Sequence, residues 1–183
     1  MKQTLFFFIA ALSVAMFSSC AKQGKNAGGG VDSTAMASAN TAQTNMSETR
    51  AFYENVMNKH DTAAADKYCA ANFVDHNPAP GHSGQGLDDL KKELGAWFAE
   101  MPDVHFDIDQ MSADSNLVWL RYTVSGTMKG DMGPMKATNK SMKIGGIDEI
   151  KIQNGKASDR WGYEDDMAMM SQLGLMPPPP GKK

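Results

Sequence analysis

The 183-residue sequence lacks several features that would each define a class of protein. It has only two cysteines, which excludes a dense disulfide framework. Its 18 Lys and Arg against 21 Asp and Glu give a formal charge of −3, so there is no basic excess of the kind that nucleic-acid binding needs. No apolar run reaches the roughly 18 residues of a membrane-spanning helix. Methionine, by contrast, is abundant, with 15 residues.

The first 19 residues are typical of an export signal. Lys2 is followed by the apolar run Leu5–Met16, which suits a signal peptide and is short for a membrane span. The small residues directly before Cys20 resemble the bacterial lipobox, in which that cysteine becomes the lipidated first residue. We therefore expect a signal peptide at 1–19 and a lipid on Cys20 that anchors the protein to a membrane of the cell envelope, on the periplasmic or extracellular side. The alternative is a secretory signal with an incidental cysteine.

Two further segments lack the apolar content of a folded domain. Residues 20–45 are rich in Gly, Ala, Ser, Thr, Asn and Gln and contain no aromatic residue, which predicts a flexible tether. Residues 177–183 begin with four consecutive prolines and predict a short extended tail. A single domain is therefore expected at 46–176.

The period of the hydrophobic pattern changes once within this domain. Apolar positions at helical spacing predict three helices, from Ser47 to near His60, from Asp61 to Cys69, and from Leu87 to before Pro102. Alternating positions then predict strands at 104–109, 117–125, 141–152 and 156–163, with a hairpin turn at Asn154-Gly155 and a closing helix at 167–173. Helices followed by antiparallel strands indicate an α+β domain with its helices on one face of a curved sheet.

Three stretches of this domain carry a resemblance to a known family. They are Phe73–Pro78 with the loop and helix after it, Val118–Thr127 with Gly133–Lys140, and Gly146–Trp161 with Leu173–Leu175. Their order and spacing resemble the SnoaL-like polyketide cyclase, or ester cyclase, group of the nuclear-transport-factor-2-like superfamily. The resemblance implies a cone-shaped barrel in which a curved antiparallel sheet wraps around N-terminal helices and leaves a deep pocket.

The same resemblance implies a function. Its cyclases hold an apolar carbonyl compound in the pocket and use cyclase or isomerase chemistry that needs neither metal nor cofactor. We therefore expect a small, largely apolar ligand with a carbonyl group, and no nucleic acid. Relatives often dimerise through the outer face of the sheet, which leaves a homodimer open here.

That chemistry requires a buried carboxylate that removes a proton and a donor for the developing oxyanion. Cyclases carry the acid on the last strand, and the matching position here is Gly162, which cannot take a proton. Asp148 is the substitute that we assign as catalytic base. A three-residue hairpin loop would place it opposite Arg160, whose charge would make it a weaker base, and a purely structural ion pair is the alternative. Glu164 and Asp165 are expected to cap the last helix.

The other candidates are expected to contact the ligand. His76 and Asn77 match a loop that borders the pocket in relatives, although Asn77-Pro78 also suits a simple turn. In a cone fold the core and the pocket wall are one layer. The complete set of proposed ligand-binding residues is His76, Asn77, Arg160, Trp119, Tyr122, Trp161 and Met135.

The methionines form two clusters, at 128–135 and 167–170. Thioethers suit Cu(I), but they also form adaptable apolar surfaces, and a soft pocket rim is the interpretation that we carry forward. No spacing of histidines matches a zinc signature, so no metal site is assigned. Three hypotheses stay open: an enzyme that uses Asp148, a non-catalytic binding protein that lost its base at Gly162, and a Met-rich copper-binding protein.

Overall fold

The computed structural model describes residues 33–176 of the chain. Its helical elements are α1 (Ser33–Phe52), which continues into a π-helical turn (Tyr53–Met57), a 3-10 turn (Thr62–Ala64), α2 (Ala65–Tyr68), α3 (Leu87–Glu100) and α4 (Asp166–Leu173). Its strands are β1 (Cys69–Asp75), β2 (His105–Ala113), β3 (Leu117–Thr127), β4 (Ser141–Gln153) and β5 (Lys156–Glu164). The predicted signal peptide, Cys20 and the Pro-rich tail lie outside the described residues.

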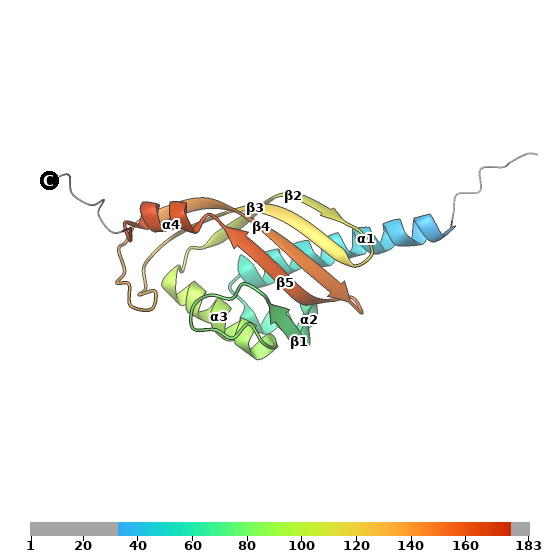
Figure 1. Ribbon diagram of the computed structural model, residues 1–183, viewed down its shortest axis with the longest axis horizontal. Coiled ribbons are helices and arrows are strands. Elements are labelled where there is room, and N and C mark those ends of the chain that lie inside the picture. The colour runs from blue at the N-terminus through green and yellow to red at the C-terminus, as the bar shows by residue number, and fades with distance from the viewer. Residues whose placement is uncertain (1–32, 177–183) are drawn as a thin grey trace, which may run out of the picture. The chain divides into compact units, whose positions relative to one another are not determined.

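The strands form one five-stranded sheet in the order β1-β5-β4-β3-β2. The sheet curves over α1 and α3, and α4 follows directly on β5 (Figure 1). This confirms the predicted α+β class with helices packed on a curved sheet. The expectation of a purely antiparallel sheet is wrong at one edge, because β1 pairs parallel to β5. Cys69, expected to end a helix, is instead the first residue of that edge strand and is buried.

The core lies between the concave face of the sheet and the helices. Alternate residues of the two central strands are buried, as their period of two predicts, namely Val118, Leu120, Tyr122 and Val124 of β3 and Met142, Ile144, Gly146, Asp148 and Ile150 of β4. The residues between them mostly face outward. One charged side chain, that of Asp148, therefore lies within the buried face of these two strands.

Helix α1 begins well before the expected start at Ser47. Residues 33–45, for which we expected a flexible tether, are helical here. They include several alanines, the residue with the highest helix propensity. Asn45 is buried, and its side-chain amide donates to the carbonyl oxygen of Ser115 at 3.1 Å, which docks the helix onto the β2–β3 connection. No helix of the described part is long and apolar enough to cross a bilayer.

The β4–β5 hairpin sets the register of the two strands that carry the candidate site. Gln153 pairs with Lys156, so the loop has two residues, Asn154 and Gly155, both with positive φ as a type I′ turn requires. A register shift follows between Lys151 and Ile152. The three-residue loop that we expected is therefore wrong, and the residue opposite Asp148 is Gly162 rather than Arg160.

Candidate functional site

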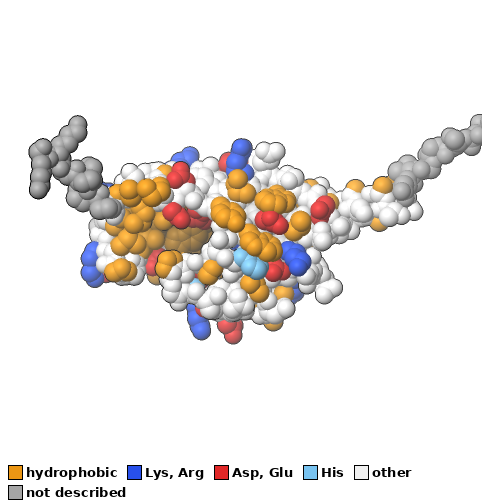
Figure 2. Space-filling view, viewed as in Figure 1, with side chains coloured by type: hydrophobic (Ala, Val, Ile, Leu, Met, Phe, Trp, Pro, Cys, Tyr) orange, Lys and Arg blue, Asp and Glu red, His pale blue; other side chains and the backbone are white. Residues whose placement is uncertain are grey.

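A cavity of about 750 Å³ opens between the sheet, α1, α3, α4 and the loop after β3. Figure 2 shows it as a hollow lined mainly by hydrophobic side chains, with acidic side chains close by. The apolar wall includes Phe52, Leu90, Leu94, Trp97, Phe106 and Ile150, together with Met57, Met132, Met135 and Met169. A cavity of this size and polarity suits a small organic ligand.

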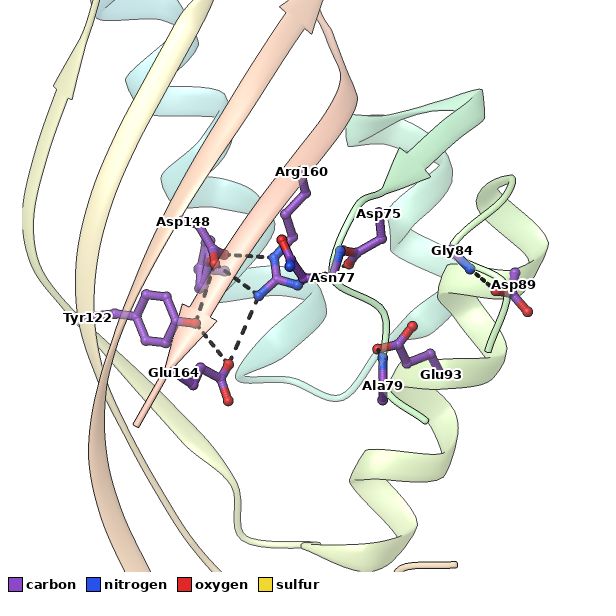
Figure 3. A network of polar contacts seen from close by, with 11 residues as sticks. Asp75, Asn77, Ala79, Gly84, Asp89, Glu93, Tyr122, Asp148, Arg160 and Glu164 are labelled. Atoms are coloured by element: carbon purple, nitrogen blue, oxygen red, sulfur yellow. Dashed lines mark hydrogen bonds and ion pairs between the residues drawn. The ribbon is translucent and has the colours of Figure 1, made fainter. Parts of the chain in front are cut away.

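Arg160 and Asp148 form the centre of the polar part of the cavity wall. The guanidinium donates through Nε to Oδ2 of Asp148 at 3.0 Å and through Nη2 to Oδ1 at 2.9 Å, a two-pronged geometry. Its Nη1 donates to Oδ2 of Asp75 at 2.9 Å. Tyr53 adds a short hydrogen bond from its hydroxyl to Oδ2 of Asp148. Figure 3 shows how these contacts join β1, β4 and β5 around one cation.

Gly162 is what allows Arg160 to reach Asp148. The guanidinium extends along β5 and covers Gly162, and a Cβ atom added there would lie 2.2 Å from Nη2 of Arg160. The predicted ion pair therefore forms, but diagonally between neighbouring pairs of the ladder rather than directly across it. The position at which the cyclases carry their acid is occupied in space by the guanidinium.

Glu164 is a site residue that sequence analysis missed. Expected as a helix cap, it instead lines the cavity, and Asp165 is the cap, accepting from the backbone N–H of Ala168. The hydroxyl of Tyr122 donates to Oε1 of Glu164 at 2.9 Å. The available signal was strand periodicity, because Glu164 lies two residues after Gly162 and so points to the same face.

The two carboxylates Asp148 and Glu164 differ in environment. The side chain of Asp148 is 1% exposed, whereas that of Glu164 is 21% exposed. Burial raises the pKa of the Glu164 carboxyl above the ordinary glutamate value, against the opposing effects of Arg160 and of the Tyr122 hydroxyl. Nη2 of Arg160 lies 4.0 Å from Oε1 of Glu164, beyond hydrogen-bond distance. Glu164 is therefore the accessible carboxylate and the one that holds its proton more tightly than usual.

The remaining groups of the polar cluster keep fixed protonation states near neutral pH. Burial, reinforced by Asp148, raises the pKa of the Tyr53 hydroxyl and of the Tyr122 hydroxyl, so both phenols stay protonated. Burial acts against the charge of Arg160, but Asp148 and Asp75 outweigh it and raise the pKa of the guanidinium well above its usual value. Proton exchange near neutral pH therefore falls to a carboxylate rather than to these three groups.

Several predicted site residues do line the cavity. Asp148, Arg160, Tyr122, Asn77 and Met135 all belong to its wall. The backbone N–H of Asn77 donates to Oδ1 of Asp75 at 2.8 Å, which fixes the start of the loop after β1.

The other predicted ligand-binding residues do not line the cavity. The ring of His76 stacks on that of Trp161 at 4.1 Å, and its Nε2 lies 3.1 Å from the Asp159 carboxylate. Trp119 is 46% exposed. Trp119 and Trp161 occupy the strand positions that alternate with the buried ones, so they lie on the outer face of the sheet, where side-chain alternation places them.

The methionine clusters are dispersed by the fold. Met128 is fully buried in the core and Met167 is exposed, whereas Met132 and Met135 bridge one another through backbone hydrogen bonds in the wall of the cavity. Within residues 33–176, no group of three or more His, Cys, Asp and Glu side chains is arranged to hold a metal ion. Of the two clusters, Met132, Met135 and Met169 contribute thioethers to the apolar wall of the cavity.

Comparison with known proteins gives a consistent picture. A family model described as SnoaL-like polyketide cyclase matches residues 47–173. TsrD from Streptomyces laurentii is 21% identical with a TM-score of 0.64, over 75% of this chain and 97% of its own. A putative polyketide cyclase from Bacillus cereus ATCC 10987 is 22% identical with a TM-score of 0.62, over 73% and 83%. A putative SnoaL-like polyketide cyclase from Jannaschia sp. CCS1 is 11% identical with a TM-score of 0.65, over 75% and 96%. No curated protein matches the chain.

The packing of Arg160 over Gly162 generates a prediction. Gly162→Ala introduces a Cβ within 2.2 Å of the guanidinium, so it should displace Arg160 from Asp148 and lower the free energy of unfolding by about 1–3 kcal/mol or more. Gly145→Ala in β4 is the matched control, because the added Cβ atom would lie 3.9 Å from the carbonyl oxygen of Tyr122, an ordinary contact distance, and it should change stability little. Urea unfolding of both variants measures the difference, and equal stabilities would contradict this account of Gly162.

Proposed function

The chain belongs to the SnoaL-like polyketide cyclase family, and from that premise we propose that its cavity binds a small, largely apolar carbonyl compound and exchanges a proton with it. The volume and apolar wall of the cavity support binding of such a molecule. The catalytic part of the proposal rests on one observation. Glu164 places a partly accessible carboxyl in the cavity wall, and burial raises the pKa of this carboxyl. A base with a raised pKa is better matched to removing a proton near neutral pH.

Asp148, the base assigned from the sequence, suits this role less well. Both of its oxygens accept hydrogen bonds from Arg160, and Oδ2 accepts a further one from Tyr53. Both oxygens are therefore occupied by donors, and the side chain is 1% exposed, so the carboxylate has little room to approach a C–H bond of a ligand. We therefore assign Asp148 to holding Arg160 in place and transfer the role of base to Glu164.

The proposed step is removal of a proton from a carbon next to the ligand's carbonyl group. Glu164 takes the proton, and the electron pair of the broken C–H bond moves onto the carbonyl oxygen. Arg160 carries N–H hydrogens beyond those that Asp148 and Asp75 use, and with the side chain of Asn77 it offers donors to the developing oxyanion. In a cyclase the enolate carbon then attacks a second carbonyl of the ligand, whose oxygen takes the proton from Glu164 as its C=O bond becomes a single bond. In an isomerase the enolate takes the proton back at another atom.

A non-catalytic binding protein is the second candidate. It is favoured by Gly162, which leaves the last strand without the acid of the cyclases, and by the full engagement of Asp148. In this alternative the cavity binds the same class of ligand, and Glu164 only accepts a hydrogen bond from it. The two candidates differ in whether a bound carbonyl compound loses a proton.

Hydrogen exchange of a bicyclic ketone distinguishes these candidates. We expect the protein to accelerate the exchange of the hydrogens next to the carbonyl of β-tetralone for deuterium in D₂O. Proton NMR measures the rate, as the signal of the activated CH₂ disappears. Because Glu164 must be ionised to act, the rate should rise with pH through a raised pKa, above the ordinary glutamate range. Glu164→Gln should slow exchange by about 100-fold or more.

Glu149→Gln is the control for this experiment. Glu149 pairs with Trp119 and Trp161 on the outer face, so its loss should leave exchange unchanged. Exchange as fast in Glu164→Gln as in the native protein would remove the catalytic role. If β-tetralone still binds in that case, as line broadening of its signals would report, the non-catalytic candidate stands.

We propose that a lipid on Cys20 anchors the protein to a membrane of the cell envelope. The sequence supports this arrangement, because a basic residue, the apolar run Leu5–Met16 and small residues directly precede Cys20. Expressed as the full precursor in a bacterium, the native protein should sediment with membranes, and Cys20→Ser should appear in the soluble fraction. Identical distributions of the two would contradict the anchor.

A homodimer through the outer sheet face is proposed on separate grounds. Trp119 and Ile147 are 46% exposed and Tyr163 is 64% exposed, and all three lie on neighbouring rows of β3, β4 and β5. Such a contiguous apolar surface is typical of a protein contact. Light scattering should give a dimer mass for the native domain and a monomer mass for Ile147→Lys, with Met36→Lys on α1 as the control. A native monomer would contradict the proposal.

A further inference from the structure

Tyr122, Gly146 and Glu164 occupy one row across β3, β4 and β5. The ring of Tyr122 crosses the strand between them, and a Cβ atom added at Gly146 would lie 2.5 Å from its Cζ. The hydroxyl reaches Oε1 of Glu164 at 2.9 Å and lies 3.4 Å from Oδ1 of Asp148 (Figure 3). One phenolic hydrogen therefore faces two carboxylates.

The two carboxylates depend on that hydrogen to different degrees. Asp148 accepts from Arg160 and from Tyr53 whether or not Tyr122 contributes. For Glu164, the hydroxyl of Tyr122 is the one hydrogen-bond donor within the described residues, because Nη2 of Arg160 is 4.0 Å away. The orientation of the Glu164 carboxylate is therefore set by Tyr122.

We propose that Tyr122 is the positioning residue of Glu164: its hydroxyl donates to the ionised carboxylate and turns to Asp148 or to a ligand oxygen when Glu164 takes up a proton. This inference rests on the proposed role of Glu164 as base. No covalent bond of the phenol breaks. The O–H rotates about the Cζ–O bond between acceptors that are already within 3.4 Å, while the proton itself moves from the ligand carbon to Glu164.

The expected signature is a change in how Glu164 titrates. Besides the neutral hydroxyl of Tyr122, three charged groups act on Glu164, namely Arg160, Asp148 and Asp166. Substitution of Tyr122 leaves all three in the chain. Tyr122→Phe keeps the ring that covers Gly146 and removes only the donor to the ionised carboxylate. The protonated form of Glu164 should therefore persist to higher pH in this variant.

Carbon-13 NMR of the glutamate carboxyl groups measures this directly and needs no ligand. The Glu164 resonance is assigned by its absence in Glu164→Gln. In Tyr122→Phe its midpoint should move upward by about one pH unit, the size expected for loss of a hydrogen bond to a charged group. Tyr53→Phe is the matched control. It removes a phenol hydroxyl of the same cluster, but this hydroxyl contacts Asp148 and not Glu164, so the midpoint of Glu164 should not change.

A second pair of variants tests the same point from the backbone. Gly146→Ala should push the phenol away from Glu164 and raise the midpoint as Tyr122→Phe does, whereas Gly145→Ala should not. An unchanged midpoint in Tyr122→Phe, or an equal shift in Tyr53→Phe, overturns the positioning role. If Glu164→Gln leaves ketone exchange intact while the Tyr122→Phe shift is present, the catalytic role of Glu164 fails and the positioning of its carboxylate by Tyr122 stands.

Discussion

The structure depends on one partly buried cation, the guanidinium of Arg160, and on the two buried aspartates that neutralise it. Taking these charges out of water is costly, and the cost is offset only when the geometry is good and the polar atoms are satisfied. The Asp148 side chain meets that condition through a fork of two hydrogen bonds from Arg160, while the third nitrogen reaches Asp75. Because Asp75 ends β1, the same cation also joins the parallel edge strand to the rest of the sheet.

This arrangement separates two tasks that a single acid would otherwise combine. Asp148, both of whose oxygens accept hydrogen bonds, holds the cation in place. Glu164, one row away and partly open to the cavity, is free to gain and lose a proton. Environment rather than residue type distinguishes the two carboxylates, since one is enclosed by donors and the other faces the cavity. The apolar wall lowers the local dielectric and so strengthens each electrostatic contact.

The sequence was informative wherever a pattern had a local cause. The period-two burial of β3 and β4, the helical spacing of Leu87, Leu90 and Leu94, and the position of a hairpin at Asn154-Gly155 were all predicted correctly, although the length of the hairpin loop was not. These features depend on residues that are close in the chain, and they were sufficient to identify the fold class.

The errors have different physical origins. The two-residue loop and the register shift beside it each moved the partner of Asp148 by one residue, from Arg160 to Gly162, and no turn signal in the sequence reveals the register shift. The early start of α1 depends on a bond from Asn45 to a residue 70 positions away. The error over Trp119 and Trp161 was avoidable, because strand alternation alone would have assigned both to the outer face of the sheet.

The long helix carries two of the polar contacts of the domain on a single face. Asn45, Thr49, Tyr53 and Val56 are three or four positions apart and are all buried, so this face is continuous up to the π-helical turn Tyr53–Met57. The same face delivers an amide to Ser115 and, about two turns later, a phenol to Asp148. A one-residue insertion between Thr49 and Tyr53 would rotate the second contact by about 100° relative to the first, so the helix could no longer make both.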